Sequence, residues 1–167
     1  MKSKNLRYRM YSLVLTHLNQ LQKGIQAYHS AIQYSLKYKN SKEYDQWARK
    51  DKTVIILNGG SSNQKGTDAY SRDDYIGTLD EAIKKLTENK IKHHIFYEPD
   101  INNTITAIAL LVDEKVWNKK DYPDLPEKVL EIIPGYDPLQ KKHIEKYKYT
   151  KEQLFLKDFL KEFKLAN

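Results

Sequence analysis

Short apolar runs alternate with longer polar segments along most of the chain. Four of the runs have the length and the branched or aromatic side chains of β-strands, at residues 10–18, 52–60, 91–99 and 106–114. The first run, MYSLVLTHL, is apolar at successive positions. This pattern predicts a central strand that is covered on both faces.

Two helices are predicted between the first two strands, at residues 21–39 and 42–49. In the longer one, four large apolar side chains lie three or four positions apart: Ile25, Tyr28, Ile32 and Leu36. Because this spacing places them on one side of a helix, we expect them to form the face that packs on the sheet.

Two later helices carry an N-terminal capping signal. Thr78-Leu-Asp-Glu81 is a capping box, and Thr150 with Gln153 forms a second one. Residues 61–77 are polar and rich in Gly and Ser, which predicts a long surface loop. Residues 115–149 are rich in Pro and Lys, and we expect them to be irregular.

The expected order of elements is strand, helix, helix, strand, helix, strand, strand, and then a C-terminal helix. Connections that contain helices favour parallel pairing among the first three strands, whereas the short link at 100–105 allows the fourth to be antiparallel. We therefore expect a single α/β domain, with a mixed four-stranded sheet and helices on both faces. Its core spans about 10–114, and 115–167 is a C-terminal extension.

The amino-acid composition bears on the cellular location of the protein. The chain has 167 residues and no cysteine, which excludes disulfides and thiolate metal ligands and favours a cytoplasmic location. No apolar run reaches the roughly 18 residues that a membrane-spanning helix needs, so no membrane partner is expected.

The chain carries a net charge of +7, which favours a polyanionic partner such as tRNA or another nucleic acid. The stretch QKKHIEKYKYTK, at 140–151, interleaves Tyr with Lys. It could bind RNA through lysine contacts to phosphates and stacking of bases on tyrosine. A general lysine bias and a solvated connector are the alternatives. A homodimer also remains open.

The first candidate for chemistry is YEPDINNTIT, at 97–106. Asp100 follows the third strand, and Asn103, Thr104 and Thr106 follow it closely. A carboxylate surrounded by neutral hydrogen-bond donors could orient a water molecule or stabilise an oxyanion. An ordinary turn between two strands is the alternative.

The second candidate lies at the start of the first helix. Lys23 falls in its first turn, and Gln26 and His29 follow at helical spacing. In open α/β sheets, ligands gather at the carboxyl ends of strands, where such helices begin. A solvated lysine and a structural histidine are the alternatives.

The third candidate is NGGSSN, at 58–63, in which Asn58, Gly59 and Gly60 could form an anion-binding nest of backbone N–H groups. A plain turn into the following loop is the alternative. The five histidines show no metal-ligand spacing, and we expect no metal and no cofactor.

Three segments together resemble the second class of peptidyl-tRNA hydrolases, the type found in archaea and eukaryotes. They are KGIQAYHSAIQY at 23–34, WARKDKTVIIL at 47–57 and EPDINNTITAIAL at 98–110. The resemblance implies a compact α/β domain with a mixed four-stranded sheet. It also implies metal-free hydrolysis of the ester that joins a peptide or aminoacyl group to tRNA.

By position, the resemblance implies catalytic roles for Lys23, Asp100 and Thr106. Asn103 would be a further hydrogen-bond donor. Thr104 matches the family pattern less closely than Thr106, and Gln26 and His29 match positions of its first-helix signature. A non-catalytic module that binds RNA or a small anion on the same fold is the alternative function.

Overall fold

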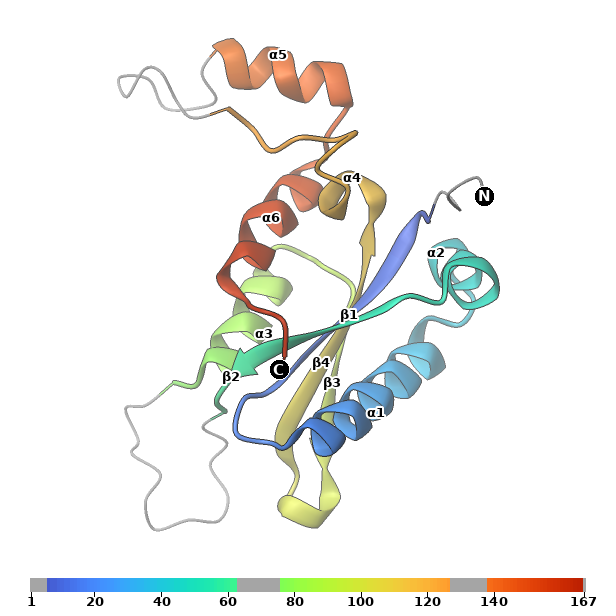
Figure 1. The fold of residues 1–167 in the computed structure, drawn as a ribbon, viewed down its shortest axis with the longest axis vertical. Coiled ribbons are helices and arrows are strands. Elements are labelled where there is room, and N and C mark those ends of the chain that lie inside the picture. Colours follow the sequence, from blue (N-terminus) through green and yellow to red (C-terminus); the bar gives the residue numbers. More distant parts are fainter. Residues whose placement is uncertain (1–5, 63–75, 127–137, 167) are drawn as a thin grey trace.

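A four-stranded mixed sheet forms the centre of the computed structural model, which describes residues 6–62, 76–126 and 138–166 (Figure 1). Its strands are β1 (Tyr8–Leu15), β2 (Val54–Gly60), β3 (His93–Glu98) and β4 (Thr104–Asp113). The α-helices are α1 (Gln20–Tyr38), α2 (Lys42–Gln46), α3 (Thr78–Glu88), α4 (Glu114–Trp117), α5 (Pro138–Tyr147) and α6 (Lys151–Phe159). Short helical turns occupy Trp47–Asp51, Pro99–Ile101 and Leu160–Glu162.

The strand order is β2-β1-β4-β3, so β1 is central, as its sequence predicted. β1 and β2 are parallel and are joined by the crossover through α1 and α2. β4 is antiparallel to both of its neighbours, β1 and β3. The mixed α/β fold expected from the sequence is therefore confirmed.

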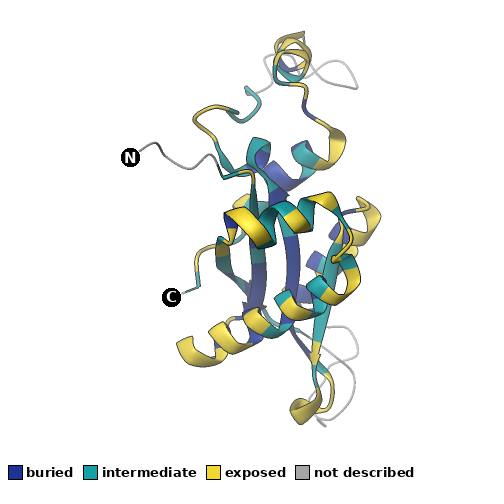
Figure 2. Cartoon of the chain, turned by 90° about the vertical axis from the view of Figure 1, so that its right-hand side faces the viewer, coloured by how far each residue is buried: buried dark blue, intermediate teal, exposed yellow. Residues whose placement is uncertain are grey.

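Helices cover both faces of the sheet. On one face, Leu13 and Ile108 of the central strands pack with Leu79 of α3 and Phe159 of α6 in one buried cluster. On the other face, α1 lies across β1, β4 and β3 and buries small side chains such as Ala27. The central strands are buried and the outer sides of the helices are exposed (Figure 2).

The orientation of α1 corrects one expectation. Ile25, Tyr28, Ile32 and Leu36 were expected to face the sheet, but all four are exposed. The buried side chains of the helix are Lys23, Gln26, Ala27, Ser30 and Tyr34. Small residues let the helix approach the sheet closely, and the polar ones find partners there, so packing and hydrogen bonding outweigh the hydrophobic pattern.

The predicted helix starts are correct at α6 and displaced by one residue at α3. Thr150 and Gln153 form the expected reciprocal capping box. At α3 the N-cap is Gly77 rather than Thr78, and the Gly77 N–H donates to Asp80. The Thr78 hydroxyl instead accepts a hydrogen bond from the Ser61 N–H at 2.9 Å.

The turn after α2 is fastened to the first strand. Asp51 is buried and accepts hydrogen bonds from the backbone N–H groups of Tyr8, at 2.8 Å, and Arg7, at 3.2 Å. Gln46 donates to the second Asp51 oxygen. The Asp51 carboxylate thereby provides hydrogen-bond acceptors for two backbone N–H groups at the start of β1.

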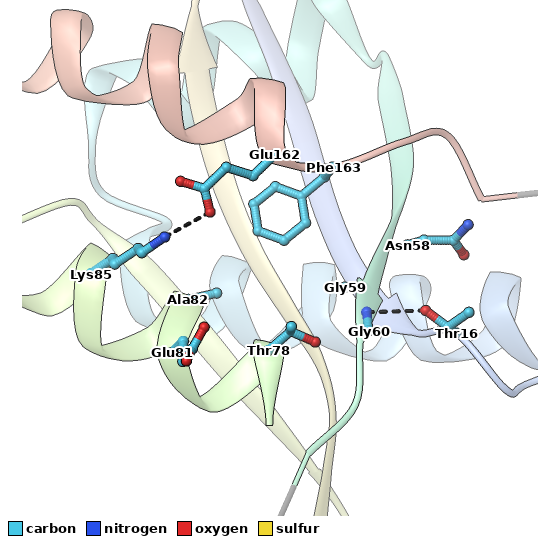
Figure 3. A pocket seen from close by; sticks show the side chains of 10 residues that line it. All are labelled: Thr16, Asn58, Gly59, Gly60, Thr78, Glu81, Ala82, Lys85, Glu162 and Phe163. Atoms are coloured by element: carbon cyan, nitrogen blue, oxygen red, sulfur yellow. Dashed lines mark hydrogen bonds and ion pairs between the residues drawn. The ribbon is translucent and has the colours of Figure 1, made fainter. Parts of the chain in front are cut away.

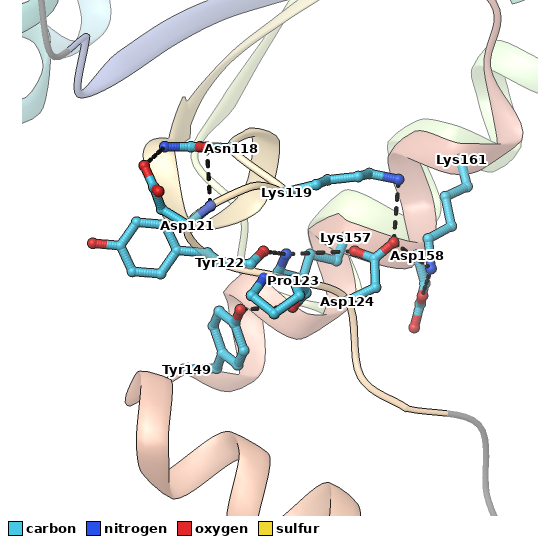
Figure 4. A network of polar contacts seen from close by, with 10 residues as sticks. All are labelled: Asn118, Lys119, Asp121, Tyr122, Pro123, Asp124, Tyr149, Lys157, Asp158 and Lys161. Carbon is cyan, nitrogen blue, oxygen red and sulfur yellow. Dashed lines mark hydrogen bonds and ion pairs between the residues drawn. The ribbon is translucent and has the colours of Figure 1, made fainter.

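The segment after β4 is more regular than expected, since α4 and α5 form within 115–149. Lys157 of α6 is buried, and its ammonium group donates to the Tyr122 carbonyl at 2.7 Å and lies 3.4 Å from Asp124 (Figure 4). Burial lowers the pKa of Lys157, and the carboxylate of Asp124 opposes that effect. The buried Tyr149 donates to the Pro123 carbonyl. These bonds fasten the connector to α6.

The last described residues lie along the outer edge of β2. The Asn58 N–H donates to the Lys164 carbonyl at 2.9 Å, and the Ala166 N–H donates to the Ile56 carbonyl at 3.0 Å. Leu57 and Leu165 form an antiparallel bridge. The tail therefore satisfies part of an edge that would otherwise offer free backbone groups.

Candidate functional site

The amino end of α1 and the β3–β4 hairpin lie at the same end of the sheet (Figure 1). Near the end of β1, Val14 pairs with Ala107 of β4, and Ala107 also pairs with Phe96 of β3. Since α1 begins soon after β1, its first turns lie beside the ends of these strands. Side-chain hydrogen bonds join these two segments, which lie some 80 residues apart in sequence, and one of them runs from Thr106 to Gln26.

Gln26 connects α1 to both strands of the hairpin. Its amide nitrogen donates to Glu98 Oε2 of β3 at 2.5 Å, and its amide oxygen accepts from the Thr106 hydroxyl of β4 at 2.5 Å. Gln26 is 7 % exposed and Thr106 is fully buried. With both ends of the amide fixed, the orientation of the side chain is set.

A β-bulge directs Thr106 toward α1. Tyr97 pairs with Ile105 and Phe96 with Ala107, so Thr106 is an extra residue relative to β3. Ile105 joins the core on the α3 side, while Ala107 packs on the α1 side. In a regular strand two successive side chains cannot share a face, and the extra residue is what lets Thr106 and Ala107 both face α1.

Lys23 and His29 lie on either side of Gln26 along α1. Lys23 is 6 % exposed, which is rare for a lysine and requires polar surroundings. His29 Nδ1 lies 4.0 Å from Glu98 Oε2, and the His29 ring contacts the Phe96 ring. His29 Nδ1 is buried and has no hydrogen-bond partner. Lys23, Gln26, His29, Glu98 and Thr106 are called the α1–hairpin cluster below.

The remaining hairpin residues lie at its tip. Asp100 is exposed in the helical turn after β3, and Asn103 is exposed just before β4. Asn102 and Asn103 both have left-handed backbone conformations, which asparagine adopts more readily than most residues. The Thr104 hydroxyl donates to the Ile101 carbonyl at 2.6 Å. Turn geometry accounts for the asparagines and for Thr104.

Sequence analysis missed Glu98, the carboxylate that hydrogen-bonds within the cluster. Glu98 ends β3 two residues before Asp100. The sequence signal for it is an acidic residue at the carboxyl end of a strand, directly after the apolar and aromatic residues Ile95, Phe96 and Tyr97.

Asn58, Gly59 and Gly60 of the NGGSSN segment line a separate cavity of about 220 Å³, and Asn63 lies outside the described residues (Figure 3). A Cβ atom on Gly59 would lie 2.5 Å from Leu79 Cδ2, and Gly60 has a φ of +85° and faces Thr78. Both glycines are therefore explained by the close approach of α3.

The charges around this cavity do not favour an anion. Glu81 and Glu162 line it, and Lys85 is paired with Glu162 at 2.7 Å. Asp80 accepts the Gly77 N–H at the start of α3. Asn58 of β2 uses its side-chain amide to donate to the Leu165 carbonyl.

In residues 6–62, 76–126 and 138–166, no three His, Asp or Glu side chains gather as a metal site would require. Over the same ranges, no helix combines the length and apolar character needed to cross a bilayer. Comparison with known proteins finds no matching family model and no matching curated protein.

Proposed function

We propose that the protein hydrolyses the ester between an acyl group, peptidyl or aminoacyl, and tRNA, as the resemblance to the second class of peptidyl-tRNA hydrolases implies. The observation that supports this proposal best is the α1–hairpin cluster. In it the amide of Gln26 is fixed between a carboxylate and a hydroxyl, and the buried Lys23 lies about one helical turn before Gln26 on the same side of α1. Such a set suits a reaction that needs charge stabilisation and an oriented water.

In the proposed reaction, water attacks the ester carbonyl carbon and transfers a proton to a carboxylate. The exposed Asp100 is the candidate for that base, since its position at the hairpin tip leaves it open to substrate. The ammonium group of Lys23 neutralises the oxyanion that develops on the carbonyl oxygen. The C–O bond then breaks, and the ribose oxygen of the tRNA leaves with a proton.

Gln26 is the proposed donor that orients the acyl group. Its amide nitrogen carries two hydrogens, and one of them is donated to Glu98. The second hydrogen is available to a substrate carbonyl. Thr106 and Glu98 act as positioning residues in this proposal, because each holds one end of the Gln26 amide.

A non-catalytic RNA-binding module is the competing function, and the net charge of +7 is compatible with both. Hydrolysis of a peptidyl-tRNA should be measured for the wild type, Lys23→Ala, Asp100→Asn and Glu98→Gln. Lys37→Ala, an exposed lysine of the same helix, is the matched control.

The proposal expects the Lys23 and Asp100 variants to lose on the order of 10²-fold or more in rate, as removal of one stabilising group does in other enzymes. Lys37→Ala should remain near the wild-type rate. Equal rates in all variants would remove the assignments. A wild type that binds tRNA with steep salt dependence but does not hydrolyse it would establish the competing function.

A further inference from the structure

One side of α1 exposes an unusually apolar surface. Five large side chains there are between 42 % and 75 % exposed, and we call them the α1 stripe: Leu21, Ile25, Tyr28, Ile32 and Leu36. At 100° per residue they fall within an arc of about 80°. The buried side chains of α1 lie on the opposite side. Contiguous apolar surface of this kind marks interaction sites.

The order of side chains in the stripe is symmetric. Leu21 and Leu36 are equally distant from the midpoint between residues 28 and 29, and so are Ile25 and Ile32. When two identical helices pack antiparallel about a two-fold axis at that midpoint, each leucine meets a leucine and each isoleucine meets an isoleucine. A two-fold interface requires such self-complementarity, because the same patch serves both subunits.

We propose that the α1 stripe is the interface of a symmetric homodimer in which two α1 helices pack antiparallel. The polar positions beside the stripe agree with this arrangement. Gln22 and Ser35 flank the stripe on its two sides, and the two-fold symmetry places them at the same level along the helix pair, so no like charges meet there.

Gly24 supports close contact between the two helices. It lies next to the stripe, and a Cβ atom placed on it would have no neighbour within 4 Å. The two stripes would together bury on the order of 1,200 Å², the lower end of the range for stable interfaces.

The interface would leave Lys23 and Gln26 uncovered, because both lie on the buried side of the helix, whereas His29 lies beside the proposed two-fold axis. The dimer proposal therefore does not depend on the proposed hydrolase activity. Dimerisation and hydrolysis are measured separately, and either can fail alone.

The first test is sedimentation equilibrium of the full chain. We expect a dimer for the wild type and a monomer for the double variant Ile25→Glu, Ile32→Glu. Leu139→Glu is the matched control, since Leu139 is an exposed leucine on another helix, α5, and should leave the dimer intact. Circular dichroism should show unchanged helicity in both variants, because the substituted side chains are exposed.

The second test uses the absence of native cysteine. Tyr28→Cys lies next to the proposed axis and should cross-link two copies under mild oxidation. In Leu36→Cys the two thiols would be about 22 Å apart along the antiparallel helices, so cross-linking should fail.

A monomeric wild type at high concentration, or a dimer that survives the double glutamate substitution, would overturn the proposal. Efficient cross-linking of Leu36→Cys would be incompatible with the antiparallel arrangement and would overturn the proposal as well. A monomer whose RNA affinity falls in the glutamate variant would assign the stripe to nucleic acid instead.

Discussion

The hydroxyl oxygen of Thr106 lies 2.5 Å from the amide oxygen of Gln26, which joins the bulge of β4 to the first turns of α1. Both residues are buried. Loss of the Thr106 hydroxyl would leave the buried amide oxygen of Gln26 without its hydrogen-bond donor. It would also release one end of the amide that is proposed to orient the acyl group.

Thr106→Val should lower the free energy of unfolding by about 1–3 kcal/mol, because a buried amide oxygen loses its hydrogen bond. In a chain of this size, each kcal/mol corresponds to a decrease in Tm of about 2–4 °C. Thermal unfolding would measure the decrease. Thr104→Val, at the hairpin tip, should change Tm less, and equal effects of the two substitutions would contradict the assignment.

Asp51→Ala should also destabilise the protein, by about 2–3 kcal/mol, because its carboxylate accepts hydrogen bonds from the backbone of Tyr8 and Arg7. Asp45→Ala is the control. Asp45 pairs with Arg49 on the surface, where ion pairs contribute at most about 1 kcal/mol. Urea unfolding would compare them, and a larger loss for Asp45 would show that the Asp51 bonds matter little.

Alanine substitutions of two glycines should have opposite effects. Gly60→Ala should cost about 2 kcal/mol or more, because Gly60 has a positive φ and faces Thr78 closely. Gly24→Ala should add roughly 0.5–1 kcal/mol, because Gly24 is helical and its Cβ would lie in open space. Both substitutions should be introduced into the Ile25→Glu, Ile32→Glu variant and measured by urea unfolding, so that self-association through α1 does not contribute to the stability. A stabilising Gly60→Ala would be incompatible with the geometry.

Alkaline pH should destabilise the fold through Tyr149. Burial, aided by the neighbouring Tyr147 and Asp124, raises the pKa of Tyr149 to about 12, whereas an unfolded tyrosine titrates near pH 10. Above about pH 10 the unfolded state loses the proton first, so stability falls as the pH rises toward 12.

Tyr149→Phe removes this titration. The stability difference between the wild type and Tyr149→Phe, measured by urea unfolding, should therefore shrink between neutral pH and pH 12. A constant difference over that range would contradict the role of Tyr149.

The strands were predictable because each has a distinctive apolar run, and the parallel pairing of β1 with β2 followed from the helical crossover. The face of α1 was not predictable from periodicity. Its five large apolar residues define one side and its small and polar residues another, and only the polar partners supplied by Glu98 and Thr106 decide which side faces the sheet.

For the candidate site, the sequence predicted roles for Lys23, Gln26 and Thr106, and the structure places all three in buried positions. The sequence could not indicate the β-bulge, which arises because β4 has one extra residue between the partners of Phe96 and Tyr97 in β3. Because side chains alternate along a strand, one such residue decides which side chain reaches α1.

The tail that lies along β2 also constrains the order of events during synthesis. Asn58 bonds to Leu165, which follows it by 107 positions in the chain. A ribosome moving at several residues per second would therefore expose the outer border of β2 for many seconds before its covering segment emerges. During that interval the nascent sheet is most open to pairing with another chain, so slow synthesis of the final helix should favour aggregation.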